Sequence, residues 1–302
     1  MKNGCGFYLY TTGFLDHKEF HVPMRLISVI IPVYNRPSLL KEAVTSVFAQ
    51  TFRDTEVIIV DDGSNDDTLK AARRLSESAP VPTWIVTISH TGRPGTVRNR
   101  GAVSAAGKYL AFLDSDDLWL PEKLEVHLDF MRAHPGLRIS HTREVWIRNG
   151  KEISQSQQKH RREGFIFQDA LKKCIIGPST VMLEKTLFNE AGGFNEKLEI
   201  AEDYELWLKI TANYPVGYID QPLTVKRAGH GDQLSEKYGQ IEYFRIQALS
   251  DLLDSYSLTA ENYAMAVHEL VRKLRIYITG LKKRGKVDET ARYEALVKKF
   301  HP

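Results

Sequence analysis

The sequence has little cysteine, no long apolar run and no dominant sign of charge. Its two cysteines, Cys5 and Cys174, can form neither a disulfide framework nor a zinc site, and free thiols indicate a reducing compartment. No stretch approaches the roughly 18 apolar residues of a membrane-spanning helix. The 41 basic and 38 acidic residues leave a net charge of +3, too small to favour a nucleic-acid partner. A cytoplasmic globular protein is therefore expected.

The length of 302 residues allows one large domain or two modest ones, at roughly 100–200 residues per domain. Residues 1–23 lack the roughly 7–15-residue apolar core of a secretory signal. Met24 stands just before the first apolar run. We therefore interpret 1–23 as an N-terminal extension, 24–232 as one α/β domain and 233–302 as a C-terminal helical region.

Four apolar, β-branched runs predict strands that are buried on both faces, as parallel strands are. They cover residues 26–33, 56–60, 84–88 and 109–113. Helical spacing follows each run, over residues 38–51, around 69–75, over 95–106 and from Pro121 to about 133. The alternation predicts an α/β fold with a mostly parallel sheet flanked by helices.

The rest of the chain is less regular. Short strands are expected near residues 138–147, 163–167, 179–183 and 216–226, and helices at 184–190 and 202–213. From Ser235 onward the pattern is helical. One apolar stripe runs along that region at helical spacing, through Val267, Val271, Leu274, Ile278 and Leu281.

Three polar clusters follow the carboxyl ends of predicted strands: Pro32–Arg36, Asp61–Asp67 and Asp114–Asp117. Ligands of open α/β sheets bind at that edge, so the clusters are expected to lie together there. The chain contains neither the G-x-G-x-x-G string of a dinucleotide site after the first strand nor a P-loop. These two kinds of nucleotide site are therefore not indicated.

The acidic cluster at the end of the fourth strand is the most informative. Asp114, Asp116 and Asp117 place three carboxylates within four positions, where they repel one another unless a cation or solvent compensates. Mn²⁺ and Mg²⁺ prefer carboxylate oxygens and share their remaining positions with phosphate. From these residues alone, a metal–diphosphate site and a solvated turn that caps the next helix both stay open.

Six short strings occur in a characteristic order: SVIIPVYN (28–35), IVDDGS (59–64), RNRG (98–101), LAFLDSDD (110–117), GGFNE (192–196) and EDYELW (202–207). Together they resemble the family 2 glycosyltransferases of GT-A fold over residues 26–230. The resemblance implies a nucleotide-sugar donor, a divalent Mn²⁺ or Mg²⁺ and inversion at the anomeric carbon.

The resemblance also assigns the donor side of the site. It implies a nucleoside pocket with Asp62 facing a uracil ring, and a UDP-linked donor. The other residues it implies for donor binding are Pro32, Val33 (through its backbone), Tyr34, Arg98 on the nucleotide side, and Asp114 and Ser115 near the ribose and donor sugar.

Metal and acceptor contacts are implied in the same way. Asp116 would bind the metal, and His230 is a second candidate ligand, in a loop similar to one that closes over the diphosphate in some relatives. Asp203 matches the general base, with Glu202 beside it contacting sugar or acceptor hydroxyls. Trp207 is expected either to stack on an acceptor sugar or to pack against the sheet.

One segment departs from the family pattern. Many relatives carry Asn-x-Gly before the R-N-x-G helix, whereas this chain has the string HTGRPG at 90–95. We interpret His90 and Arg93 as lining a solvent-facing loop, with phosphate contact as the alternative. Cys174 is interpreted as a small core residue.

The expected reaction transfers a sugar to a hydroxyl of a glycan or lipid-linked acceptor in cell-surface polysaccharide synthesis. The alternatives are a GT-A-like module that binds nucleotide sugar without turnover, and a sugar nucleotidyltransferase. Residues 261–302 hold ten basic and five acidic residues. This basic region is expected either to contact a membrane peripherally or to pack on the catalytic domain or on a second copy in a homodimer.

Overall fold

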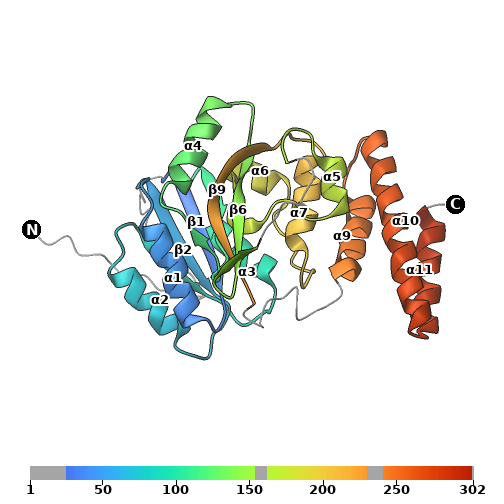
Figure 1. Ribbon diagram of the computed structural model, residues 1–302, viewed down its shortest axis with the longest axis horizontal. Helices are drawn as coiled ribbons and strands as arrows, with labels where there is room; N and C mark the ends of the chain where they lie inside the picture. The colour runs from blue at the N-terminus through green and yellow to red at the C-terminus, as the bar shows by residue number, and fades with distance from the viewer. Residues whose placement is uncertain (1–24, 154–161, 230–240, 301–302) are drawn as a thin grey trace, which may run out of the picture.

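One mixed sheet organises the molecule. The computed structural model describes residues 25–153, 162–229 and 241–300 (Figure 1). The strands in these ranges are β1 (Ile27–Val33), β2 (Thr55–Asp61), β3 (Thr83–Thr87), β4 (Tyr109–Phe112), β5 (Leu118–Trp119), β6 (Ile139–Arg148), β7 (Lys151–Ile153), β8 (Val181–Glu184) and β9 (Gly217–Ala228). Their order across the sheet is β3-β2-β1-β4-β8-β6-β9-β5, with β7 paired to β6.

The first half of the sheet is parallel. Strands β3, β2, β1 and β4 pair in parallel, and β8 then adds antiparallel to β4. Val33 pairs with Asp61 at the ends of β1 and β2. The polar segments that follow these two strands therefore begin at the same edge of the sheet.

Helices cover both faces of this sheet, which confirms the predicted α/β architecture. On one face lie α1 (Pro37–Phe48), α2 (Thr68–Glu77) and α4 (Lys123–Ala133). On the other lie α3 (Pro94–Ser104), α5 (Phe167–Lys172), α6 (Lys185–Glu190) and α7 (Glu202–Thr211). In β1, Val29 and Ile31 enter the first core and Ile30 enters the second, which explains its unbroken apolar run.

The C-terminal helices extend the second core. They are α9 (Ile241–Ser255), α10 (Ala260–Lys283) and α11 (Val287–Phe300), and they lie at one end of the molecule (Figure 1). Val271, Leu274, Ile278 and Leu281 of the predicted stripe are buried in the same apolar cluster as α7. Lys273 ties α10 to α5 by donating to the Lys172 carbonyl at 3.0 Å.

Two local predictions differ from the structure. The strand expected at 163–167 is wrong: Gly164 forms only an isolated bridge with Val216, and α5 begins at Phe167. Gly164 has φ +76°, which interrupts an extended strand. The two-residue strand β5 has no sequence signal and is formed by pairing with Thr224 and Val225 of β9. No helix among the described residues has the length and apolar character needed to cross a membrane.

Candidate active site

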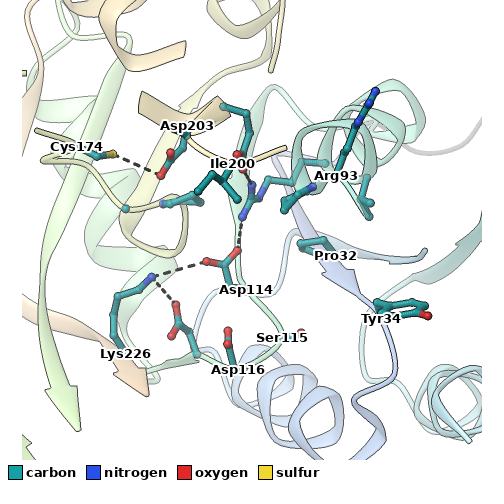
Figure 2. A pocket seen from close by; sticks show the side chains of 18 of the residues that line it. Pro32, Tyr34, Arg93, Asp114, Ser115, Asp116, Cys174, Ile200, Asp203 and Lys226 are labelled. Atoms are coloured by element: carbon teal, nitrogen blue, oxygen red, sulfur yellow. Dashed lines mark hydrogen bonds and ion pairs between the residues drawn. The ribbon is translucent and has the colours of Figure 1, made fainter. Parts of the chain in front are cut away.

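A cavity of about 890 Å³ opens at the carboxyl ends of β1 and β4 (Figure 2). Its walls also include segment 174–178, the start of α7 and the end of β9. The fold brings ten of the expected site residues to this one cavity: Pro32, Val33, Tyr34, Asp62, Arg98, Asp114, Ser115, Asp116, Glu202 and Asp203.

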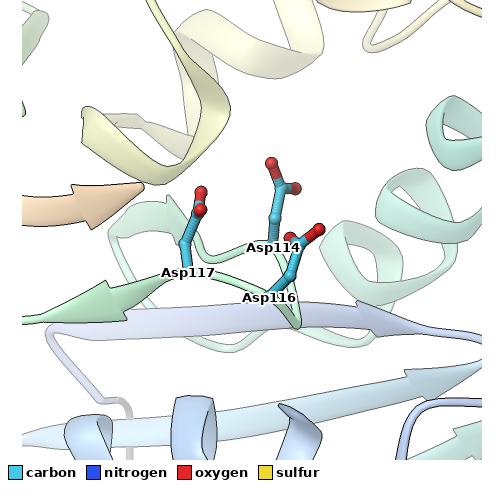
Figure 3. Close-up of side chains that lie close together, drawn as sticks. All are labelled: Asp114, Asp116 and Asp117. Atoms are coloured by element: carbon cyan, nitrogen blue, oxygen red, sulfur yellow. The ribbon is translucent and has the colours of Figure 1, made fainter. Parts of the chain in front are cut away.

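The three carboxylates after β4 form one cluster in the cavity. One oxygen from each of Asp114, Asp116 and Asp117 lies within 4.8 Å of the others (Figure 3). A tight turn produces this grouping, because the Asp117 N–H donates to the Asp114 carbonyl at 2.9 Å. An all-oxygen donor set at this spacing fits a hard divalent cation such as Mn²⁺ or Mg²⁺.

Cationic side chains compensate this acidic cluster within the protein. Arg36 Nη1 lies 3.0 Å from Asp116 Oδ2, and Lys226 Nζ lies 2.9 Å from Asp117 Oδ2 and 3.7 Å from Asp114 Oδ2 (Figure 2). Burial lowers the pKa of Lys226, but these carboxylates outweigh it and hold the pKa above its ordinary value. The repulsion expected among the acids is thus already balanced in part, and a bound cation would share that task.

Ser179 fixes the shape of the acidic cluster. Its hydroxyl donates to Asp117 Oδ2 at 2.6 Å and accepts from the Asp114 N–H at 3.1 Å. The Ser179 carbonyl in turn accepts from Trp119 Nε1 at 2.7 Å and from Thr224 Oγ1 at 3.1 Å. Because Ser179 is fully buried, these bonds hold two of the three acids on a rigid support.

Arg98, on α3, lies between two acids. Its Nη2 donates to Asp114 Oδ1 at 2.6 Å and its Nη1 donates to Glu202 Oε1. Burial opposes ionisation of Asp114, but the charges of Arg98 and Lys226 outweigh it and lower its pKa to about 2. Burial raises the pKa of Glu202 to about 7 against the pull of Arg98. Asp114 is therefore a permanent anion, whereas Glu202 titrates near neutral pH.

Asp203 stands on the first turn of α7, on another wall of the cavity. The chain enters this helix through Ala201 in the left-handed region, at φ +65°. That sharp entry brings both Glu202 and Asp203 to the cavity wall. Asp203 Oδ1 accepts from the Tyr204 N–H at 2.7 Å, and its Oδ2 lies 3.4 Å from the Cys174 thiol (Figure 2).

The side of the cavity near Tyr34 is built around Asp62. The Asp62 carboxylate accepts from the N–H groups of Thr91 at 2.8 Å and Gly92 at 2.9 Å, and from Thr91 Oγ1 at 3.0 Å. The His90 ring stacks on Tyr34, with 4.0 Å between centroids and 21° between planes. His90 is exposed on the loop that follows β3, as the sequence interpretation expects, and its ring also packs on a residue of the cavity wall.

Three further sequence interpretations need comment. Trp207 does not line the cavity, because its side chain is 2 % exposed and packs edge-on against Phe194. The expected stacking of Trp207 on an acceptor sugar is therefore wrong, and the alternative, that it packs inside the protein, is confirmed. Cys174 is partly buried: it packs against the second core, as expected, and it also lines the cavity beside Asp203. His230 lies outside the described residues.

Several residues at the site carry no clear sequence signal. Lys226 is separated from the acidic cluster by more than a hundred positions and reads only as part of a strand. From the sequence, Ser179 after Gly177-Pro178 is interpreted either as bordering the donor sugar or as part of a plain turn. Their contacts depend on how β9 and the segment before β8 meet the end of β4. Inspection of the amino-acid sequence does not reveal this arrangement.

Comparison with known proteins identifies relatives of this chain. Residues 28–191 match the sequence profile of glycosyl transferase family 2. An uncharacterized glycosyltransferase of Rickettsia felis is 36% identical over 233 residues, which are 73% of this chain and 37% of that protein. The chain thus spans little more than a third of that relative's length. The Escherichia coli UDP-Glc:alpha-D-GlcNAc-diphosphoundecaprenol beta-1,3-glucosyltransferase WfgD is 29% identical over 65% of this chain and 73% of its own.

Solved structures share the fold. TarS of S. aureus, residues 1-349 in complex with UDP-GlcNAc, superposes with a TM-score of 0.63 over 91% of this chain and 92% of its own, at 18% identity. The mannosyltransferase PcManGT of Pyrobaculum calidifontis, in complex with GDP-Man and Mn²⁺, superposes with a TM-score of 0.60 over 94% of this chain and 87% of its own, at 17% identity. The predicted GT-A architecture is confirmed. Because the family profile matches more than half of its residues, the chain belongs to glycosyl transferase family 2.

Proposed function

We propose that this chain is an inverting, metal-dependent glycosyltransferase that moves a sugar from a UDP-linked donor to a hydroxyl of a glycan or lipid-linked acceptor. One observation carries the proposal: a single cavity is lined by the acidic cluster of Asp114, Asp116 and Asp117 and, separately, by the carboxylate of Asp203. A metal–diphosphate site and a base for the acceptor are the two parts that such a transfer needs.

The acidic cluster supports a metal role at the leaving group. A bound Mn²⁺ or Mg²⁺ would neutralise the charge that develops on the departing diphosphate. Asp116 is the proposed ligand, because it is held by one ion pair with Arg36, whereas Asp117 is buried under Ser179 and Lys226. The same Arg36 would then be released toward the phosphates.

Asp203 is the proposed general base. A carboxylate that takes the proton of an acceptor hydroxyl makes it a competent nucleophile. One base and one in-line displacement predict inversion at the anomeric carbon. Glu202, buried beside Arg98, is proposed to contact hydroxyl groups of the sugar or acceptor.

A UDP-linked donor is proposed from the Tyr34 and Asp62 wall, where an aromatic face and a carboxylate lie side by side. WfgD is named for a UDP-Glc donor and a diphosphoundecaprenol-linked acceptor, and TuaG of Bacillus subtilis for teichuronic acid biosynthesis. These names support a role in cell-surface polysaccharide synthesis. We further propose that the protein works in the cytoplasm, with the basic helices α10 and α11 touching an anionic membrane that holds the acceptor.

Substitution of the base tests this proposal. The assay follows UDP release from UDP-glucose or UDP-GlcNAc in the presence of Mn²⁺ and polyprenyl-diphosphate-linked GlcNAc. Asp203→Asn should lower the rate of this release by about 10²–10⁴-fold. UDP affinity should stay within about twofold, because the amide keeps the shape of the side chain. Asp288→Asn is the matched control, since Asp288 is likewise the second residue of a helix, α11, and is exposed. Transfer that persists in Asp203→Asn would refute the base assignment.

A further inference from the structure

His90 makes the two contacts that a planar base would make beside Tyr34. Its ring stacks on the Tyr34 ring at 4.0 Å between centroids. Its Nδ1 lies 3.0 Å from Asp62 Oδ2 and 3.0 Å from the Asp62 carbonyl oxygen. Both partners are acceptors without a hydrogen, so Nδ1 must carry the proton and donate it. The imidazole therefore donates its ring N–H to the Asp62 carbonyl oxygen and lies beside the Asp62 carboxylate, while one of its faces is covered by an aromatic ring.

The Asp62 carboxylate has no acceptor position to spare in this arrangement. Its two oxygens offer about four lone-pair sites. Thr91 supplies two donors and Gly92 one, and His90 Nδ1 lies 3.0 Å from Oδ2, where it covers the remaining position. A nucleobase that is to bond Asp62 must therefore replace one of these donors.

The imidazole is the group that is freest to leave, because two of the other donors are backbone N–H groups and the Thr91 hydroxyl also accepts from the Arg93 N–H at 3.2 Å. The segment before Thr91 is packed on the end of β2, where the Ile88 N–H donates to the Asp61 carbonyl at 3.0 Å. A Cβ at Gly63 would lie 2.7 Å from the His90 backbone nitrogen, so the two segments are in close contact. The His90 side chain, in contrast, is 47% exposed and can swing away by rotation about its own bonds.

We propose that His90 is a specificity-determining residue that fills the base site of the empty enzyme and is displaced by the donor nucleotide. This proposal rests on the proposed function, because it takes the donor to be a nucleotide. Displacement costs the protein its own stack and hydrogen bond, so only a base that restores both binds well. His90 thereby discriminates among bases while leaving the diphosphate contacts untouched.

The acceptor position that His90 releases defines the class of base. Once the imidazole leaves, Asp62 Oδ2 regains one position next to the Tyr34 face, while the three contacts from Thr91 and Gly92 remain. A pyrimidine with a single imide N–H, such as uracil or thymine, uses that one position. Guanine brings an N–H and an amino group on the same edge and would leave one donor without a partner.

Calorimetric titration of UDP and of inorganic pyrophosphate, both with Mn²⁺, separates the base from the diphosphate. His90→Ala should bind UDP about tenfold more tightly than the wild type and pyrophosphate equally well. His90→Phe should gain less for UDP than His90→Ala, because its ring still covers Tyr34 although the hydrogen bond of Nδ1 is lost. His134→Ala is the matched control: His134 packs on Phe130 at 4.3 Å and its Nδ1 contacts the Phe130 carbonyl at 2.8 Å, away from the cavity.

Five results would overturn the proposal. Weaker UDP binding in His90→Ala would make His90 a direct contact of the base rather than its competitor. Equal UDP binding in both proteins, or an equal gain for UDP and pyrophosphate, would remove any role in base selection. Binding of pyrophosphate without UDP in all variants refutes the base site alone, whereas binding of neither ligand refutes the proposed function as well.

Discussion

At the scale of single residues, Arg98 divides one positive charge between two acids. The pKa of Asp114 is lowered to about 2, because Lys226 and Arg36 add to the charge of Arg98, whereas burial raises the pKa of Glu202 to about 7. Neighbouring acids whose pKa values are pushed apart in this way are typical of sites that hold one anion and move one proton. Glu202 is thus suited to exchange a proton near neutral pH, beside the proposed base.

This difference predicts a pH dependence of stability. The folded pKa of Glu202, about 7, exceeds its ordinary value of 4.5, so between these values the folded state holds a proton that the unfolded state has lost. The contribution of Glu202 to stability therefore falls as pH rises from 4.5 through 7. We expect the melting temperature of metal-free wild-type protein to fall, relative to that of Glu202→Gln, as the pH rises from about 5 to about 8. Each kcal/mol lost from the free energy of unfolding should lower the melting temperature by roughly 2–4 °C.

Thermal melts across that pH range, with EDTA present, measure the difference. Glu289→Gln, at an exposed carboxylate of α11, controls for the loss of one charge. If the melting temperatures of wild type and Glu202→Gln keep a constant separation from pH 5 to pH 8, the raised pKa is refuted.

The sequence predicts site residues well when they are close together along the chain. Asp114, Asp116 and Asp117 are recognisable as a cluster because a buried strand precedes them. Lys226 is not recognisable, since its contacts arise only when separate strand ends meet. Trp207 shows the opposite case, in which a residue type that often binds sugars is buried by its helix face.

At the scale of elements, α3 depends on a close approach to β1. A Cβ added at Gly101 would collide with the Ile30 side chain. Gly101→Ala should therefore reduce the free energy of unfolding by about 1–3 kcal/mol, the usual cost of overpacking a core. Because α3 also carries Arg98, the ion pairs to Asp114 and Glu202 should loosen with it.

Denaturant unfolding measures this cost. Gly136→Ala is the matched control, because a Cβ there meets nothing within 4 Å. An unchanged unfolding midpoint in Gly101→Ala would mean that α3 shifts away from β1 without penalty, contrary to the tight packing described.

Elements with a long periodic pattern are predicted correctly, and short ones are not. The four apolar runs become β1 to β4 because each must be buried on both faces, a requirement that is visible in the composition of the run itself. The residues at 163–167 have strand-like composition, but no neighbouring strand pairs with them beyond the Gly164 bridge. Strand β5 exists only because β9 lies beside it. Pairing partners thus decide the short elements.

At the scale of the whole molecule, the C-terminal helices belong to the core of the sheet domain. Leu274 of α10 is fully buried in the cluster that also contains Tyr204 and Leu206 of α7. Leu274→Ala should cost about 2–5 kcal/mol and shift a single unfolding transition, whereas Ile276→Ala, at a 57 % exposed side chain, should cost less than about 0.5 kcal/mol.

The number of transitions tests the predicted division at residues 232 and 233. Fluorescence and circular dichroism should report the same midpoint in wild type and in Leu274→Ala. Two separate midpoints, with only one moved by the substitution, would mean that the helical region unfolds independently of the sheet domain.

The central claim is that this cavity binds a nucleotide diphosphate through a metal held by Asp116. Calorimetric titration of UDP into wild type and Asp116→Asn, each with Mn²⁺ and each with EDTA, tests it most directly. We predict that wild type binds UDP at least about tenfold more tightly with Mn²⁺ than with EDTA, and that Asp116→Asn loses this difference. UDP affinity that is equal with and without Mn²⁺, or a full metal effect in Asp116→Asn, would contradict the claim.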